Sequence, residues 1–156
     1  MDYTSRNHAR GFANRTRKNL KYIETAFENN TADVHVVTQI INSLLGLIIF
    51  LREKGAMKSI AIKRLADLKA EGWPEWTFTY GSSKTLDDLT KELRNAVAHG
   101  NIDYSSESRN SDEVDIEVKT YIPPEYTVLK WSAKISATHL RDFCLHLSDL
   151  IEKTPE

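Results

Sequence analysis

The sequence predicts a mainly α-helical domain: an antiparallel bundle of four to five helices, with a small β-hairpin or meander inserted before the last helix. Three observations carry this prediction. Apolar residues recur at helical spacing over most of the chain. Between about residues 102 and 132 the period changes to alternation, and after that segment the helical period returns. Capping residues and glycines mark the ends of the helical segments.

The helical segments can be followed along the chain. They cover residues 14–29, 34–54, 56–71 and 83–99, and the segment that follows a cap at Ser136. The second segment is apolar on most sides, so we expect it to be the central, most buried helix. Gly72 followed by Trp73-Pro74 ends the third. Thr85, with Asp88 three residues later, resembles a capping box at the start of the fourth, and Gly100 ends it.

The strands and the domain limits follow from the same patterns. Alternating apolar residues predict two strands, at Val114–Val118 and within Tyr126–Ser132. Residues 1–13 are polar and basic, and we expect a flexible arm there. The remainder, residues 14–153, is expected to form one domain that carries the β insertion at about 102–132.

Composition narrows the class of protein. The chain has 156 residues, of which 40% are hydrophobic and 28% charged, as in a globular domain and not a disordered one. Its single cysteine, Cys144, excludes an internal disulfide and a cysteine-based zinc site. No signal peptide is recognisable, and the longest apolar run, Ile40–Leu51, is too short to cross a bilayer. We therefore expect a cytoplasmic protein that does not associate with a membrane.

Charge is distributed unevenly along the chain. The formal net charge is −1, but residues 1–22 and 52–70 are basic whereas residues 103–117 are acidic. Such a division would steer a polyanion to one face of the molecule. Ordinary solvated surface is the alternative explanation.

Four aromatic residues form a connection between the third and fourth helices: Trp73, Trp76, Phe78 and Tyr80. Aromatic rings in a connection can stack on nucleobases. We expect packing over one end of the bundle instead, because large rings bury much apolar surface.

Two pairs place an Arg and a His five positions apart: Arg94 with His99, and Arg141 with His146. An Arg can hold a phosphate and a His can move a proton, which is most of what metal-free RNA cleavage needs. The spacing alone decides nothing. With nine Arg and five His in the chain, about one match is expected by chance.

Context favours the first pair. The second lies in mid-helix beside Phe143 and Cys144, on an apolar stripe that we expect to face the core, with Cys144 as a small buried hydrophobe. Between Arg94 and His99 the side chains are short, and Gly100 turns the chain away directly after the His. Carbonyl dipoles at a helix end favour a protonated imidazole, which suits a residue that acts as both acid and base.

The geometry of a single ideal helix does not bring Arg94 and His99 together. Positions five apart are about 140° apart around an ideal helix, so Arg94 and His99 do not share one face. The length of the arginine side chain and an unwound last turn would reduce the separation. A two-fold dimer with facing motif helices would reduce it more, because one composite site would then hold two Arg and two His.

Two segments resemble the HEPN superfamily. Glu92–Asn101 strongly resembles the HEPN motif helix, whose signature is an Arg, a polar residue beside it, and a His after four to six residues in all. Thr38–Leu47 is similar to the second helix of a plasmid-associated bacterial HEPN family. The resemblance runs from about Asn14 to the last helix, and the helix count and the insertion after the motif agree with it.

The resemblance implies a homodimeric endoribonuclease that needs no metal or other cofactor. The 2′-hydroxyl of RNA would attack the adjacent phosphate and leave a 2′,3′-cyclic phosphate and a 5′-hydroxyl. On that pattern His99 acts as general base, or as general acid from the second subunit. Arg94 would hold the scissile phosphate, and Asn95 would orient one of these groups or bond the phosphate. The implied role is a toxin or defence effector, with an antitoxin or regulatory protein as a further partner.

No metal site is expected from the sequence. There is no carboxylate cluster of the two-metal type, and His139 and His146 lack a third ligand, so both are interpreted as solvated histidines. One departure from the family concerns regulation. HEPN toxins that a nucleotidyltransferase silences carry a Tyr two positions after the His, where this chain has Asn101.

Some alternatives stay open at this level. Gln39 and Asn42 lie three apart on an apolar helix; as buried amides they either brace the motif helix or satisfy each other and the backbone. The alternative to a nuclease is a catalytically silent HEPN dimer that binds RNA, nucleotides or another protein. A purely structural helical dimer, in which the motif is a coincidence, is the third option.

Overall fold

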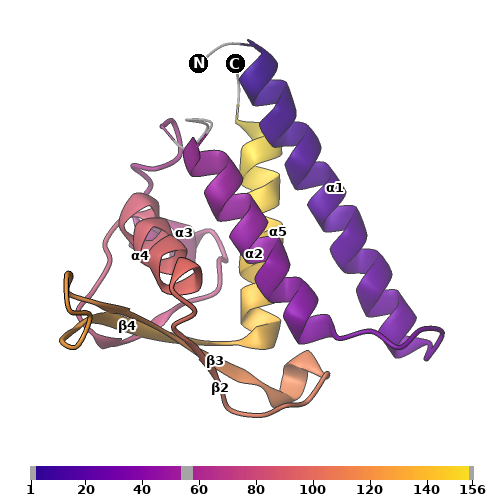
Figure 1. The fold of residues 1–156 in the computed structure, drawn as a ribbon. Coiled ribbons are helices and arrows are strands. Elements are labelled where there is room, and N and C mark those ends of the chain that lie inside the picture. The colour runs from indigo at the N-terminus through magenta and orange to yellow at the C-terminus, as the bar shows by residue number, and fades with distance from the viewer. Residues whose placement is uncertain (1–2, 54–57, 155–156) are drawn as a thin grey trace.

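The computed structural model describes residues 3–53 and 58–154. Three long helices lie side by side and contact one another: α1 (Tyr3–Glu28), α2 (Val36–Glu53) and α5 (Ala137–Lys153) (Figure 1). The motif helix, α4 (Leu86–Ala98), packs between α2 and a small β-sheet, and α3 (Leu65–Ala70) is a short helix. The described chain thus has five helices and a small sheet, which confirms the predicted mainly-α class.

The central helix is α2, as its apolar composition predicts. It contacts α1, α4 and α5 and buries one broad side, made of Val36, Val37, Ile40, Ile41, Leu44, Leu47 and Ile48. Gly46 lets α1 come close. A Cβ at this position would lie 2.7 Å from the Phe12 ring, so any larger residue would force the two helices apart.

The sheet is larger than the predicted hairpin. Its four strands are antiparallel in the order β1-β4-β3-β2. They are β1 (Thr77–Tyr80), β2 (Ile102–Tyr104), β3 (Asp115–Tyr121) and β4 (Leu129–Ser136). The two central strands, β3 and β4, correspond to the predicted ones. Both outer strands are additions of the tertiary structure: β1 and β2 have only four and three residues, too few to show a periodic signal.

The register of the central hairpin gives the sheet one apolar face. Ile116 pairs with Ile135 and Val118 pairs with Ala133, and all four are buried. This face meets α4. Strand β1 precedes α4 in the chain, and β2, β3 and β4 follow it. The chain segments at both ends of the motif helix therefore lead into the sheet.

The predicted flexible arm over residues 1–13 is wrong where the structure describes it. Helix α1 begins at Tyr3, and Ala9 and Ala13 are buried. Small alanines carry this inward face, so the sequence shows no strong apolar period there. Basic residues of α1 bond to the last helix and the residue that caps it: Arg10 donates to the Thr154 carbonyl at 2.6 Å, and Arg17 contacts Glu152 at 2.6 Å.

The third helix is much shorter than the expected 56–71. Helix α3 covers Leu65–Ala70 only, whereas residues 58–62 form turns, and residues 56 and 57 lie outside the described residues. Backbone pairing with the segment before α4 competes with helix formation here. Leu65 donates its N–H to the Lys84 carbonyl at 2.9 Å, and Leu86 donates to Lys63 at 2.9 Å.

The predicted ends of α4 and the predicted cap of α5 are confirmed. Thr85 and Asp88 form a reciprocal capping box at the start of α4, and Ser136 caps α5. Gly100 has a φ of +68°, the left-handed conformation that glycine adopts without strain. Backbone N–H donors of Thr85 and Lys84 lower the pKa of the Asp88 carboxyl below its ordinary value of 3.8.

We expect Asp88→Ala to lower the free energy of unfolding by about 0.5–1 kcal/mol at pH 7, because the start of α4 loses one acceptor of its capping box. A lowered carboxyl pKa stabilises the fold above the ordinary value of 3.8 and ceases to do so as pH falls through the lowered value. The difference between wild type and variant should therefore shrink as the pH falls below 3.8. Urea unfolding at pH 7 and at pH 2.5 measures the difference in the free energy of unfolding between wild type and variant. An equal difference at the two pH values would contradict the capping role of Asp88.

Candidate active site

An open groove lies where the C-terminal end of α4 meets the β3–β4 hairpin. It encloses about 520 Å³ and is lined by Glu92, Arg94, Asn95, His99 and Asn101 on one side and by Thr120, Tyr121, Ile122, Pro123, Tyr126 and Lys130 on the other. The three residues that the sequence predicts as catalytic therefore share one groove within a single chain. The helix supplies them, and the hairpin supplies the opposite wall.

Arg94 is the exposed cation of this groove. Its Nη1 donates to Asn95 Oδ1 at 3.3 Å, and it contacts no carboxylate among the described residues. Four other arginines differ: Arg17, Arg52, Arg109 and Arg141 each contact a carboxylate. Because no acid neutralises it, the Arg94 guanidinium is available for an external anion such as a phosphate.

His99 lies just beyond the regular helix. It is the C-terminal capping residue of α4, with φ −97° and ψ 3°, and its N–H donates to the Asn95 carbonyl at 3.2 Å. Gly100 then turns the chain toward β2. This unwound turn brings the imidazole to the same groove as Arg94, although the two positions are about 140° apart on an ideal helix.

The hairpin provides groove residues that the sequence did not single out. The Tyr126 ring lies against the His99 ring, with centroids 5.1 Å apart and planes tilted by 39°. Tyr126 has a φ of +55°, which is uncommon for a residue with a side chain. The only sequence signal was the Pro123-Pro124 turn, which indicates a loop but not which helix the loop approaches.

Glu92 is also a groove residue found only in the structure. Its largely buried carboxylate accepts hydrogen bonds from Thr120 Oγ1 at 2.8 Å and Lys130 Nζ at 2.6 Å. These contacts join α4 to both strands of the hairpin. The Lys130 ammonium also balances the negative charge of the Glu92 carboxylate. That charge would otherwise repel an anion from the groove.

Comparisons with known proteins place the chain in a family. The model of the family HEPN pEK499 p136 matches residues 1–156. The chain belongs to the HEPN superfamily. Neither a curated protein nor a solved structure matches it. HEPN domains are often ribonucleases and commonly form dimers, which fits a nuclease or a nucleotide-binding module.

The two amides proposed to support the HEPN motif are not buried. Asn42 is exposed and Gln39 is half-buried, and Gln39 Nε2 donates to Ser43 Oγ at 3.4 Å. Neither lines the groove. The prediction of buried amides is wrong because α2 turns this stripe outward, away from α5.

The second Arg–His pair belongs to the framework of the bundle. Arg141 contacts Glu24 of α1, a hydrogen bond that raises the pKa of the guanidinium. His146 is half-buried and stacks on Trp73 with centroids 5.2 Å apart, so it is not the solvated histidine that the sequence suggested. Cys144 is buried, as predicted, and burial raises the pKa of its thiol.

Trp73 and Trp76 pack as the sequence predicts. Both are buried, and both meet the Phe143 ring edge-on, with centroids 5.5 and 5.7 Å apart. They hold α5 against the connection before α4. Phe78 continues this packing toward Trp131 in β4, at 6.0 Å. These three rings stabilise the fold. Tyr80, the fourth ring of the connection, is 54% exposed, so the packing prediction is wrong for that residue.

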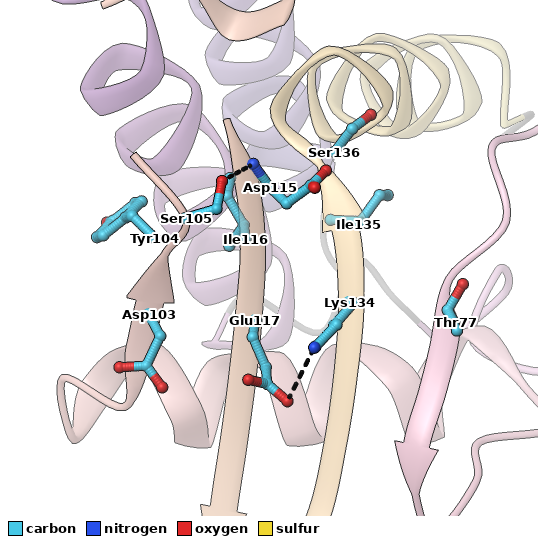
Figure 2. A pocket seen from close by; sticks show the side chains of 10 residues that line it. All are labelled: Thr77, Asp103, Tyr104, Ser105, Asp115, Ile116, Glu117, Lys134, Ile135 and Ser136. Atoms are coloured by element: carbon cyan, nitrogen blue, oxygen red, sulfur yellow. Dashed lines mark hydrogen bonds and ion pairs between the residues drawn. The ribbon is translucent and has the colours of Figure 1, made fainter. Parts of the chain in front are cut away.

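A second hollow of about 470 Å³ lies on the sheet and is lined mainly by polar residues of β2, β3 and β4 (Figure 2). Its carboxylates are Asp103, Asp115 and Glu117, and Lys134 lies 4.0 Å from Glu117. The neighbouring Lys119 is bonded to Asp103 and Glu117, which raises its pKa. No three His, Cys, Asp or Glu side chains of the described residues could together hold a metal ion.

Within residues 3–53 and 58–154, no helix combines the length and apolar character that a membrane span requires.

The two arginines should respond differently to removal. Arg141→Ala is expected to lower the free energy of unfolding by about 1 kcal/mol, because it leaves the largely buried Glu24 carboxylate without its partner while partial exposure weakens the pair. Arg94→Ala should change it by less than about 0.5 kcal/mol, because Arg94 is exposed and has no carboxylate partner. Chemical denaturation at pH 7 gives both values. Equal losses would mean that Arg94 also has a framework role.

Proposed function

We propose that this HEPN protein is a metal-independent endoribonuclease. The observation that carries the proposal is the convergence of an unpaired guanidinium, an amide and an imidazole on one open groove. Arg94, Asn95 and His99 all line it, from one and a half turns of the same helix. The groove can hold a phosphate at Arg94 and place a proton acceptor beside it, which are the two requirements of cleavage by an internal nucleophile.

The chemistry uses the substrate's own 2′-hydroxyl. His99 removes its proton as the 2′-oxygen forms a bond to phosphorus, and the bond from phosphorus to the 5′-oxygen breaks. A proton from His99 of the partner subunit goes to that leaving oxygen. Arg94 stabilises the charge that develops on the phosphorane-like transition state. The products are a 2′,3′-cyclic phosphate and a 5′-hydroxyl.

Asn95 serves as the residue that orients the arginine. Its Oδ1 accepts from Arg94 Nη1, so the Nδ2 group keeps its two donors for a phosphate oxygen. A held guanidinium loses less conformational freedom when it binds, which improves the phosphate site.

A second copy of the chain would complete the site. Arg94 lies on the outward face of α4 with the exposed Lys91 and Ala98. On α2, a stripe at helical spacing also faces outward; it contains Thr38, Asn42, Leu45 and Ile49, of which the first two are exposed and the last two only half-buried. Because α2 and α4 are in contact, we propose that these two faces together form the dimer contact, across which a two-fold axis would bring the motif helices together.

The biological role that we propose is a toxin or defence effector. Arg94 and His99 are exposed in the described chain, so a cell would need an external means of restraining the enzyme. An antitoxin or another regulatory protein that covers the groove would supply it.

Cleavage should depend on the motif and not on a metal. We expect the purified protein to cut RNA in excess EDTA, and Arg94→Ala or His99→Ala to reduce the rate by at least about 100-fold. Arg64→Ala is the matched control, because Arg64 is exposed and has no carboxylate partner among the described residues. Arg141→Ala should also cut at temperatures where it stays folded. Gel analysis gives the cleavage rates, and end-group mapping identifies the termini of the RNA products.

The outcomes separate the alternatives. A wild type that shifts RNA in a gel but leaves it intact in EDTA would identify a silent binding module. A wild type that neither cuts nor binds would end the nuclease proposal. Cleavage that survives His99→Ala would assign the chemistry to other residues.

The dimer has its own test. Asn42→Glu introduces a charge on the outward face of α2, where the single chain leaves the side chain exposed and folding should be unaffected. We expect the variant to sediment as a monomer and to lose cleavage. Glu28→Gln, an exposed change at the end of α1, serves as the control. A monomeric Asn42→Glu variant with full activity would show that one chain holds a complete site.

A further inference from the structure

The tip of the β3–β4 hairpin carries an exposed apolar surface beside the groove. Ile122, Tyr126 and Val128 are 49%, 47% and 58% exposed. They account for three of the seven large hydrophobic residues that are exposed among the described residues, within a stretch of seven positions. Ile122 and Tyr126 also line the groove that holds Arg94 and His99. Exposed apolar residues that cluster next to a polar groove indicate a binding surface.

The tip is held in a defined conformation. Ile122 donates its N–H to the Val128 carbonyl at 2.8 Å, and Tyr126 donates to the Ile122 carbonyl at 3.1 Å. These bonds close the loop and direct the Tyr126 ring toward the end of α4, where it meets His99. Nearly half of Tyr126 remains exposed despite this contact, so part of its ring surface is open. A tyrosine with a positive φ that lies against His99 favours a functional role.

The charged residues near Tyr126 indicate which kind of ligand its open ring surface would bind. Arg94 provides an uncompensated positive charge in the same groove, whereas Glu92 is neutralised by Lys130. A polyanion with flat, apolar rings between its charges matches this arrangement. A nucleobase next to a phosphate has that chemistry, because every base presents a π-face that stacks on an aromatic side chain.

We infer that Tyr126 is the stacking platform for an unpaired nucleobase next to the scissile phosphate, so that the enzyme's substrate class is single-stranded RNA. This inference rests on the proposed nuclease function and adds the substrate class to it. Bases inside a duplex are stacked on one another and cannot reach a ring on the protein. With a base on Tyr126 and a phosphate at Arg94, the 2′-hydroxyl between them lies close to His99.

Binding of an uncleavable RNA tests the platform. The probe is a fluorescein-labelled 2′-O-methyl oligoribonucleotide of about 12 nucleotides, whose blocked 2′-oxygen prevents cleavage, used as a single strand and as a duplex. Tyr126→Asn removes the ring but suits the left-handed backbone, and Tyr126→Phe keeps the ring. Tyr104→Asn is the matched control, because Tyr104 is 46% exposed and lines the other hollow.

The expected result is specific to the ring and to single strands. Tyr126→Asn should weaken single-strand binding roughly 5- to 150-fold, the effect of removing one base-stacking ring. Tyr126→Phe and Tyr104→Asn should stay within about twofold of wild type. The duplex should bind more weakly than the single strand and be insensitive to Tyr126→Asn.

Three results would overturn the platform. The first is a Tyr126→Asn variant that binds the single strand as tightly as wild type, and the second is an equal loss of affinity for the duplex. The third is a Tyr126→Asn variant that sediments as a monomer, which would place the ring at the contact with a second copy. Failure of the platform is distinguishable from failure of the nuclease. If Tyr126→Asn binds the probe and cuts RNA like wild type, the platform is overturned while the nuclease stands. If wild type binds the probe through Tyr126 but cuts nothing, the platform is supported and the nuclease is overturned.

Discussion

The burial of one side of α4 is the constraint on which the site depends. Leu86, Leu89, Leu93 and Ala96 are fully buried between α2 and the sheet. This packing fixes the rotation of α4 about its axis. With the apolar side held inward, Arg94 must lie on the outward face, and His99 must leave the helix at the end nearest the hairpin. The exposure of the motif is therefore a consequence of core packing.

A second set of contacts joins this helix to the hairpin. Glu92 lies on α4 beside the motif and bonds to Thr120 and Lys130 on the two central strands. Such charge-assisted bonds are stronger than bonds between neutral groups. They hold the hairpin over the end of α4, so that Tyr126 reaches His99. The contacts that hold the two walls of the groove together are thus made by Glu92, Thr120 and Lys130, which take no part in the proposed chemistry.

The packing of the helices also explains why the two Arg–His pairs of this chain have different surroundings. Arg141 points to α1 and is bound by Glu24, whereas His146 stacks on Trp73. Each side chain of that pair stabilises a contact between elements. Arg94 and His99 have no such role in the bundle: among the described residues, the Arg94 side chain donates to the neighbouring Asn95, and the His99 ring lies against the ring of Tyr126. Position relative to the core, and not spacing, separates the two pairs.

The mainly helical class, the capping box at Thr85 and the turn at Gly100 could be predicted from the sequence, because caps, turns and apolar periods are local signals. The choice of Arg94, Asn95 and His99 rested on their place at a helix end and on the resemblance to the HEPN motif helix, and it stays a prediction. Local signals failed where small alanines formed the inward face of α1 and where three- or four-residue strands completed the sheet. Only the tertiary structure decided that Asn42 faces outward and that Glu92, Tyr126 and Lys130 belong to the groove. Those residues come from segments far apart in the chain, and their meeting depends on how α4 packs against the hairpin, which no local pattern encodes.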